Sequence, residues 1–240
     1  MSPAHRPRRV LVTGASRGIG LEFVRQLLAR GDHVIATARH PGRAQALNHL
    51  AGEHPGRLHV LPLDVADPKS HAELVRELPL VLDGDGARLN LLINNAGVLH
   101  SGERFGHVPL AQMDDSLRTN VTGPFLLTQT LAEHLADGAV VANLSSILGS
   151  IARVDGFHTP SYAISKAAQN MATVLLAQGL SERGIVVLAL HPGWVQTDMG
   201  GDGAQIAAEQ SVAGLLKVIG NATQADSGHY IDWQGAPLPW

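Results

Sequence analysis

Cysteine is absent from the sequence, positive charge is not in excess, and no long apolar run occurs. Without cysteine the chain has no disulfide, thiol nucleophile or thiolate metal site. The formal net charge is −3 and the arginines are scattered, so we expect no basic surface and no nucleic-acid partner. The stretch Met1–Arg9 has no apolar segment of signal-peptide length, and no later apolar run reaches the roughly 18 residues of a membrane span. We therefore expect a cytoplasmic protein with no membrane partner.

Histidine is plentiful, with 13 in the chain, but no metal site is predicted. None of these histidines falls in an H-E-x-x-H motif or in a similarly tight ligand spacing. Isolated surface histidines explain the pattern better than a metal centre does.

The 240 residues are 45% hydrophobic, which is enough for one well-filled core. Short apolar runs alternate with amphipathic segments, a pattern typical of βαβ units around a buried parallel sheet. Strands are predicted at residues 9–13, 33–37, 58–63, 89–94, 139–144, 186–191 and 228–232. Helices are predicted at about 19–28, 67–78, 113–135, 162–182 and 205–219.

These elements predict an α/β fold with a single Rossmann-type, doubly wound domain over residues 1–240. A seven-stranded, mostly parallel sheet should carry helices on both faces. Residues 1–8 are expected to form a flexible N-terminus. In such a fold, ligands bind at the carboxyl ends of the strands, so the loops that follow the strands should form the site.

A glycine-rich turn, Thr13–Gly20, follows the first predicted strand directly and precedes an amphipathic helix. Glycine lets the backbone turn tightly and approach a pyrophosphate, whose charge then meets the unpaired N–H groups at the helix N-terminus. This position between a strand and a helix favours a nucleotide site over an ordinary loop. Predicted contacts in the turn are Gly14, Ser16, Arg17, Gly18, Ile19 and Gly20.

Arg39 ends the second predicted strand, where an acidic residue would bind the ribose 2′-hydroxyl of NAD. With no carboxylate there and with Arg17 nearby, a 2′-phosphate is favoured, since each charged hydrogen bond contributes about 1.5–3 kcal/mol. The sequence therefore predicts NADP(H) as the cofactor. The alternative for Arg39 is a solvated loop arginine.

Three more strand-end loops lie where the same cofactor would pass. The loop after the third strand is expected to contact the adenine, the loop after the fourth to lie close to a ribose, and the loop after the sixth to meet the nicotinamide. Each loop could alone be an ordinary turn, and their shared placement carries the argument. The predicted contacts are Asp64 and Val65 in the first, Asn95, Ala96 and Gly97 in the second, and Pro192, Gly193, Val195 and Thr197 in the third.

Tyr162 and Lys166 are four residues apart on a predicted helix, so their side chains share one face. A nearby cation favours the phenolate, and we expect Lys166 to lower the pKa of Tyr162 from about 10 towards the range in which proton transfer is efficient. Taken alone, the pair is also what a packed ring beside a solvated amine would give.

The motifs follow one another in a fixed order along nearly the whole chain. They are Thr-Gly-x-x-x-Gly-x-Gly at 13–20, Asn94-Asn95-Ala96-Gly97, Asn120, Ser146, Tyr162-x-x-x-Lys166 and Pro192-Gly193. Together they resemble the short-chain dehydrogenase/reductase (SDR) family. Within it, residues 144–151, 191–199 and 232–240 look like the C-factor-like carbonyl reductase branch.

The resemblance implies four catalytic residues, Asn120, Ser146, Tyr162 and Lys166. Ser146 would hydrogen-bond the substrate oxygen, with Ser145 as the alternative, and Tyr162 would exchange a proton with that oxygen. Lys166 would hold the nicotinamide ribose, so Tyr162 and Lys166 also count among the cofactor contacts. Asn120 would position a water that relays protons to Lys166.

Two departures from the common family pattern bear on the substrate. The interval from Ser146 to Tyr162 is longer by a few residues, and little chain separates Thr197 from the helix expected at 205. A short lid predicts an open site that accepts bulky or varied carbonyl compounds. The predicted lining residues are Leu148, Phe157, Trp194, Met199 and His100.

The resemblance implies an NADP(H)-dependent oxidoreductase that transfers hydride between NADPH and the carbonyl of an aldehyde or ketone, or oxidises a secondary alcohol in reverse. The alternative is an NADP(H)-binding signalling or sensor protein of C-factor type with little turnover. The expected partners are a small-molecule carbonyl or alcohol and further copies of the chain. A homodimer or homotetramer would pair through the predicted helices 113–135 and 162–182.

Overall fold

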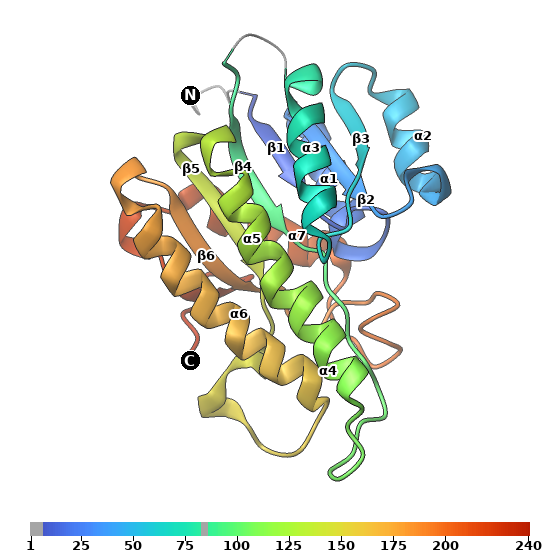
Figure 1. Ribbon diagram of the computed structural model, residues 1–240, viewed down its shortest axis with the longest axis vertical. Helices are drawn as coiled ribbons and strands as arrows, with labels where there is room; N and C mark the ends of the chain where they lie inside the picture. The colour runs from blue at the N-terminus through green and yellow to red at the C-terminus, as the bar shows by residue number, and fades with distance from the viewer. Residues whose placement is uncertain (1–6, 83–85) are drawn as a thin grey trace.

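A seven-stranded parallel sheet forms the centre of the protein in this computed structural model, which describes residues 7–82 and 86–240 (Figure 1). The strand order is β3-β2-β1-β4-β5-β6-β7. From β1 to β3 the chain adds strands towards one edge of the sheet, and from β4 onward it adds them towards the other edge, so the order switches between β1 and β4. The predicted sheet is confirmed. Its strands are β1 (Arg9–Val12), β2 (His33–Ala38), β3 (Leu58–Pro62), β4 (Leu89–Asn94), β5 (Leu135–Leu144), β6 (Val186–His191) and β7 (Tyr230–Asp232).

Helices cover both faces of the sheet, with α3, α5 and α6 across the near face in Figure 1 and α1, α2 and α7 on the other. In the described part of the chain, no helix combines the length and the apolar content needed to cross a membrane. The helices are α1 (Gly18–Ala29), α2 (Gln45–Glu53), α3 (Pro68–Val81), α4 (Leu110–Leu117), α5 (Gly123–Thr130), α6 (Pro160–Gly179) and α7 (Ala208–Asn221).

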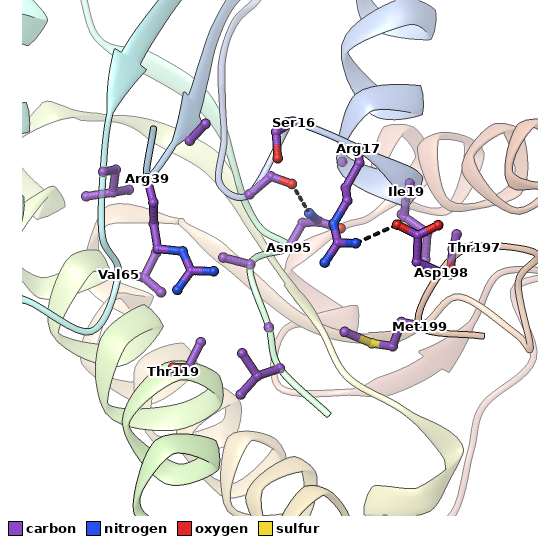
Figure 2. A pocket seen from close by; sticks show the side chains of 18 of the residues that line it. Ser16, Arg17, Ile19, Arg39, Val65, Asn95, Thr119, Thr197, Asp198 and Met199 are labelled. Atoms are coloured by element: carbon purple, nitrogen blue, oxygen red, sulfur yellow. Dashed lines mark hydrogen bonds and ion pairs between the residues drawn. The ribbon is translucent and has the colours of Figure 1, made fainter. Parts of the chain in front are cut away.

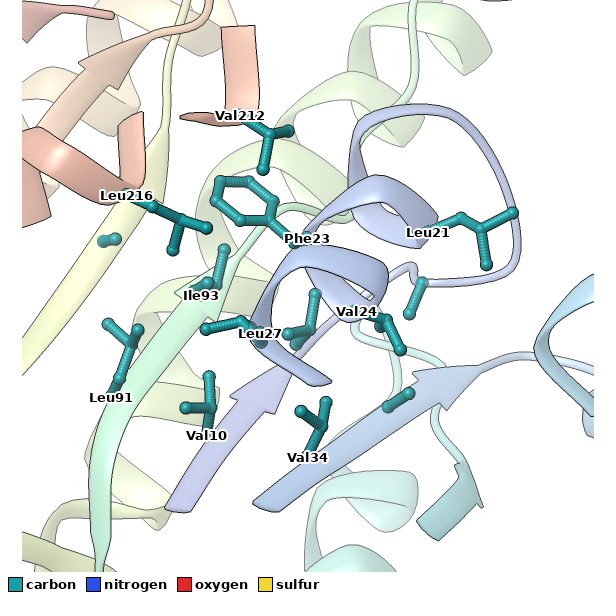
Figure 3. Close-up of a cluster of buried hydrophobic side chains, with 14 of the residues drawn as sticks. Val10, Leu21, Phe23, Val24, Leu27, Val34, Leu91, Ile93, Val212 and Leu216 are labelled. Atoms are coloured by element: carbon teal, nitrogen blue, oxygen red, sulfur yellow. The ribbon is translucent and has the colours of Figure 1, made fainter. Parts of the chain in front are cut away.

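Alternate residues of the central strands pack into two apolar cores. In β1, Val10 and Val12 belong to the core under α1 and α7, whereas Leu11 between them belongs to the core under α3 and α5. Figure 3 shows the first core, where Phe23 of α1 lies between α7 and the sheet. Because both faces are covered, the strands are largely apolar, and this explains why their positions are legible in the sequence.

The helix predicted at 113–135 is wrong in its bounds. The segment begins earlier, as α4, widens into a π turn at Arg118–Thr122, and ends at Thr130 as α5. β5 begins at Leu135 rather than at 139, because the pair Asp137-Gly138, which resembles a turn, is part of an irregular stretch of this strand. Gly138 takes a φ of 74° there, which glycine adopts without strain.

Other boundaries also differ from the prediction. α6 begins at Pro160 and ends at Gly179, and α7 begins later than expected because Ile206 pairs with Val195 in an isolated bridge. α2 is not predicted at all. Its apolar face is narrow but present, because Leu47 is buried and Leu50 and Ala51, three and four residues later, pack against the same core.

The segment predicted to be flexible is 1–8, of which residues 1–6 lie outside the described residues. Arg8, at the end of this segment, donates its backbone N–H to the Asp32 carboxylate at 2.9 Å. Its guanidinium lies 3.5 Å from the same carboxylate. The chain is therefore anchored to the turn before β2 from Arg8 onward.

Candidate active site

A groove of about 410 Å³ opens at the carboxyl ends of β1 to β4, where the strand order switches direction (Figure 2). It brings together thirteen of the predicted cofactor contacts and one predicted substrate residue, Met199. The cofactor contacts are Gly14, Ser16, Arg17, Gly18, Ile19, Gly20, Arg39, Asp64, Val65, Asn95, Ala96, Gly97 and Thr197.

Six residues line this groove that the sequence analysis does not name. Each adjoins a predicted site residue in the chain, so widening every motif by one residue would have found them. They are Ala38, Leu63, Val98, Thr119, Gln196 and Asp198.

The glycine-rich turn lies too close to its neighbours to carry side chains. A Cβ on Gly14 would lie 2.8 Å from the Cα of Ala96, and a Cβ on Gly20 would lie 2.3 Å from the Gly14 carbonyl oxygen. Gly14 also has a φ of 64°. The helix α1 that follows has no side-chain cap at its N-cap residue, Arg17, so its first N–H groups are available to an anion.

Asn95 ties the glycine-rich turn to the end of β4. Its side-chain amide donates to the carbonyl oxygens of Thr13 at 2.9 Å and of Gly14 at 3.0 Å. In return, the Thr13 hydroxyl accepts the backbone N–H groups of Asn95 at 3.1 Å and of Ala96 at 3.0 Å. These four hydrogen bonds fix the floor of the groove.

Two arginines face the groove from opposite sides (Figure 2). The Arg17 guanidinium pairs with the Asp198 carboxylate at 2.5 Å, and both side chains are about three-quarters exposed. Arg39 extends into the groove, and no described residue forms a hydrogen bond or ion pair with its guanidinium. The free cation beside the end of β2 fits a phosphate group.

The loop after β3 is held from α3. Asp64 accepts the N–H of Ala66 at 3.0 Å, and the Ser70 hydroxyl accepts the N–H of Asp64 at 2.9 Å. The buried imidazole of His71 bonds through Nε2 to the Val65 carbonyl at 2.8 Å. The loop predicted to contact the adenine is thus fixed by hydrogen bonds on its inner side.

Tyr162, Lys166 and Ser146 lie in one cluster, in which Tyr162 and Lys166 are buried. Tyr162 is 8% exposed and Lys166 4%, and the Lys166 Nζ lies 5.5 Å from the centre of the Tyr162 ring. The Lys166 amine donates to the Leu144 carbonyl at 2.6 Å and to Gln169 Oε1 at 2.8 Å. It also lies near Gly97, which places the cluster beside the groove.

Ser146, rather than Ser145, faces the phenol. Hydrogen bonding by the Ser146 side chain acts to lower the pKa of Tyr162, which places Ser146 beside the phenol. Ser145 is 2% exposed, and its hydroxyl donates to Asn170 Oδ1 at 2.6 Å on α6. Of the two candidates, Ser146 therefore has the position that the predicted role requires.

The expected direction of the Tyr162 pKa is wrong. Burial raises the pKa of Tyr162 to about 12, and the hydrogen bond with Ser146 opposes this only in part. Burial also lowers the pKa of Lys166 to about 7. The prediction assumed a solvated ammonium, but desolvation disfavours the charged form of both groups.

Asn120 lies in the π turn between α4 and α5 and is fully buried. Its Oδ1 accepts the Val98 N–H at 2.8 Å, and its Nδ2 donates to the Val98 carbonyl and to the Ser165 hydroxyl, both at 2.9 Å. The side chain therefore joins the loop after β4 to α6. A water positioned by this side chain, as predicted, would have to compete with these three hydrogen bonds.

A carboxylate from a distant loop caps the helix that carries Tyr162. Thr159, the residue before α6, has a left-handed φ of 39° and forms no side-chain cap. Instead, the buried Glu103 accepts the Ser161 N–H at 3.1 Å, and the Ser161 hydroxyl accepts that of Ser116 at 3.2 Å. Sequence reasoning missed Glu103, because the contact spans 58 residues.

Five predicted cofactor contacts do not line the groove: Tyr162 and Lys166, which belong to the cluster beside it, and Pro192, Gly193 and Val195, which lie after β6. The Pro192 carbonyl accepts the Ser211 hydroxyl at 2.6 Å, and Val195 pairs with Ile206. Gly193 has a φ of 83°, and a Cβ there would lie 2.3 Å from Ile206 Cδ1. These residues shape the segment after β6 from behind the groove.

Four of the five predicted substrate residues lie outside the groove as well. The Trp194 indole donates to the Gly200 carbonyl at 2.8 Å. Phe157 packs edge-on against Phe105, with ring centres 5.6 Å apart, and His100 lies 2.9 Å from the Asp115 carboxylate. Leu148, at the turn after Ser146, is 39% exposed.

Among the described residues, no group of three or more His, Cys, Asp or Glu is arranged to hold a metal ion.

A family model described as short chain dehydrogenase matches residues 8–206. This chain belongs to the short-chain dehydrogenase family. The resemblance drawn from the motifs is confirmed. Members of this family are oxidoreductases.

Relatives of this short-chain dehydrogenase include an enzyme and a signal protein. The 1-hydroxy-2-glutathionyl-2-methyl-3-butene dehydrogenase of Rhodococcus sp. strain AD45 is 34% identical over 235 residues, which cover 96% of this chain and 99% of that one. The C-signal protein of Myxococcus xanthus is 40% identical over 154 residues, which cover 63% of this chain and 93% of that one.

Solved structures of carbonyl reductases share the fold. The NADPH-bound carbonyl reductase from chicken fatty liver is 41% identical and superposes with a TM-score of 0.92 over 98% of this chain and 100% of that one. The carbonyl reductase Sniffer of Drosophila melanogaster is 31% identical, with a TM-score of 0.92 over the same shares.

Proposed function

We propose that this chain is an NADP(H)-dependent carbonyl reductase that acts on aldehydes or ketones and, in reverse, on secondary alcohols. The observation that carries the proposal is the cluster of Ser146, Tyr162 and Lys166 beside a groove suited to a dinucleotide phosphate. The 41% identity to an NADPH-bound carbonyl reductase supports the same assignment.

The residues of the groove fit NADP(H). The close approach at Gly14 and Gly20 leaves backbone where a side chain would otherwise fill the space, next to the uncapped N-terminus of α1. Arg39, without a partner among the described residues, supplies a cation for the 2′-phosphate, and Arg17 can join it by leaving Asp198. When bound, the cofactor supplies or accepts the hydride.

The cluster supplies the proton and the polarising hydrogen bond. Tyr162 is protonated at neutral pH, since the ordinary tyrosine pKa is already well above 7 and burial raises it further, and it can give a proton to the oxygen of a carbonyl. The Ser146 hydroxyl, beside the Tyr162 phenol, is placed to donate to the same oxygen as charge develops on it. Lys166 donates to the Leu144 carbonyl, and its Nζ lies 5.5 Å from the centre of the Tyr162 ring.

The proposal is tested by NADPH oxidation against a panel of aldehydes, ketones, diketones and quinones, with NADH and the Tyr162→Phe variant run in parallel. Turnover with NADPH is expected, and Tyr162→Phe should lower kcat by about 10²- to 10⁴-fold. Binding of NADPH by the variant, followed by fluorescence, should be unchanged. Near-normal turnover by Tyr162→Phe would contradict the proposed mechanism.

A second candidate is a signalling protein that binds NADP(H) and has little turnover. The 40% identity to the C-signal protein over 93% of its length favours this candidate. Tight NADPH binding with no turnover across the panel would support it. The presence of Ser146, Tyr162 and Lys166 in one cluster supports the enzyme, since a sensor has no need of a proton donor beside the cofactor.

We also propose a homodimer or homotetramer that uses the outer face of α6. Ile164, Met171 and Leu175 lie on this helix with 49%, 61% and 55% of their surface exposed. Sedimentation of the wild type and of Met171→Lys tests the proposal, and a wild-type monomer would contradict it. The cytoplasmic location stays a prediction.

A further inference from the structure

The chain has two tyrosines, and the second, Tyr230, contacts the backbone of Ser146. Tyr230 begins β7 and is 2% exposed. Its hydroxyl donates to the Ser146 carbonyl oxygen at 2.5 Å, and the Gly149 N–H donates to the same oxygen at 2.8 Å. Because a carbonyl oxygen has two lone pairs, this one is fully used. The main chain of Ser146 is therefore fixed from β7 as well as from its own turn.

The rest of that turn is held by Asn170 of α6. Its Oδ1 accepts the Ser145 hydroxyl at 2.6 Å, and its Nδ2 donates to the Gly149 carbonyl at 3.2 Å. Burial raises the pKa of Tyr230 above its ordinary value, so the Tyr230 hydroxyl remains a donor through neutral and mildly alkaline pH. The hydrogen bond from Tyr230 to the Ser146 carbonyl is thus kept over the pH range in which a reductase would be assayed.

Trp240 covers Tyr230 and joins it to the segment that follows the turn. The two rings stack with centres 5.4 Å apart and an angle of 18° between their planes. The Trp240 carbonyl accepts the Ala152 N–H at 2.9 Å, and the neighbouring Pro239 carbonyl accepts the buried Ser150 hydroxyl at 2.7 Å. The motif at the end of the sequence therefore has a place in the fold beside the candidate catalytic serine.

We propose that Tyr230, braced by Trp240, is a positioning residue that sets the orientation of the Ser146 hydroxyl towards the substrate oxygen. This inference rests on the proposed carbonyl reduction and gives β7 a part in it. A hydrogen-bond donor stabilises developing charge only while it is held at the right distance, and a displacement of about 1 Å can cost roughly a hundredfold in rate. Without Tyr230, the Ser146 carbonyl would keep one of its two hydrogen bonds.

The test compares kcat, KM for the carbonyl and Kd for NADPH in Tyr230→Phe, in Ser146→Ala and in the double variant. Tyr230→Phe should lower kcat about ten- to a hundredfold and change Kd for NADPH by less than about twofold. In the Ser146→Ala background, the same change should lower kcat by less than about twofold, because its effect passes through Ser146. If Tyr230→Phe only damaged the structure, it would lower kcat by the same factor in the wild-type and the Ser146→Ala backgrounds.

Ser227→Ala is the matched control. It removes one hydrogen bond, which Ser227 accepts from the Val187 N–H at 3.1 Å at the far end of β6, and should leave kcat unchanged. An unchanged kcat in Tyr230→Phe, or equal losses in both backgrounds, overturns the positioning role and leaves the reductase proposal standing. Absence of turnover in the wild type overturns both. If Tyr230→Phe does not fold, Trp240→Ala in the two backgrounds decides by the same comparison.

Discussion

Arg17 and Asp198 form an ion pair across the mouth of the groove, with 2.5 Å between the guanidinium nitrogen and the carboxylate oxygen (Figure 2). The pair joins the glycine-rich turn to the segment after β6. Both side chains are about three-quarters exposed, so the pair adds little to stability. Its main effect should be on the cofactor, because Asp198 competes with a phosphate for Arg17.

Asp198→Asn should therefore tighten NADPH binding by roughly two- to fivefold, since Arg17 is released from a pair worth at most about 1 kcal/mol. Titration of NADPH by fluorescence at low and high salt measures the effect, which should shrink at high salt. Asp202→Asn, an exposed acid in the same loop, is the control. Weaker binding by Asp198→Asn would show that the pair supports the groove instead of competing for Arg17.

Arg39→Asp should reverse the cofactor preference. The change removes a cation that faces the groove and adds a carboxylate that repels a 2′-phosphate, so the ratio of kcat/KM for NADPH to that for NADH should fall by at least about ten- to a hundredfold. Steady-state kinetics with both cofactors measure the ratio. Arg43→Asp carries the same charge change on an exposed arginine outside the groove and should leave the ratio unchanged. An equal shift in both variants would remove Arg39 from this role.

Ser146→Ala should affect mainly turnover, whereas Ser145→Ala should affect mainly stability. Ser146→Ala removes a donor to the substrate oxygen and should lower kcat about 10²- to 10³-fold. Ser145→Ala removes the hydrogen bond to Asn170 and should cost about 1 kcal/mol of stability with a smaller loss of kcat. Turnover and thermal unfolding of the two variants separate the effects. A larger kcat loss in Ser145→Ala would assign the role to Ser145.

Lys166 should make stability depend on pH. Burial lowers its pKa to about 7 from the ordinary 10.5, so between these values the unfolded chain binds a proton that the folded protein does not. The free energy of unfolding should therefore rise with pH, by roughly 1.4 kcal/mol per pH unit relative to Lys166→Met, which cannot titrate. Urea unfolding of both proteins between about pH 7 and pH 10 gives the difference. A difference that does not change with pH would mean that the buried amine keeps its ordinary pKa.

Glu103→Ala should weaken the start of α6. The change leaves the Ser161 N–H without its acceptor and should cost about 1–2 kcal/mol of unfolding free energy. Because Tyr162 follows Ser161 directly, kcat should fall while NADPH binding stays the same. Glu103→Gln keeps an oxygen acceptor and should lose less, and Glu77→Ala, on the exposed face of α3, should have little effect. A loss in Glu77→Ala equal to that in Glu103→Ala would argue against the cap.

The groove is largely predictable because its signals are local. The glycine-rich turn, Arg39 and the Asn95 loop each follow an apolar strand directly, and the topology alone brings strand ends together. Such contacts depend on the order of elements and not on their exact packing. Residues that adjoin these motifs, such as Asp198, belong to the same local signal.

The residues that hold the cluster of Ser146, Tyr162 and Lys166 in place are not predictable in the same way. Glu103 reaches Ser161 across 58 residues, and Tyr230 reaches Ser146 across 84, so no spacing in the sequence marks either contact. The direction of the Tyr162 pKa depends on burial, which a helical spacing of four does not reveal. α2 differs, because Leu47, Leu50 and Ala51 have helical spacing and pack on the core, so this helix could have been predicted from the sequence.

The buried polar side chains of α6 have a consequence for how this helix is seated. Ser161, Ser165 and Thr173 recur at multiples of one turn and bond to Ser116, Asn120 and Asn143, each on a different element. Apolar contacts are non-directional and tolerate a small slide of the helix. A hydrogen bond, in contrast, is lost when its donor and acceptor move apart by a fraction of an ångström. A shift of α6 along its axis would break all three bonds together. Replacing these residues with apolar ones of similar size would therefore be expected to leave the helix bound to the sheet but free to choose among neighbouring registers, with Tyr162 no longer at one fixed depth.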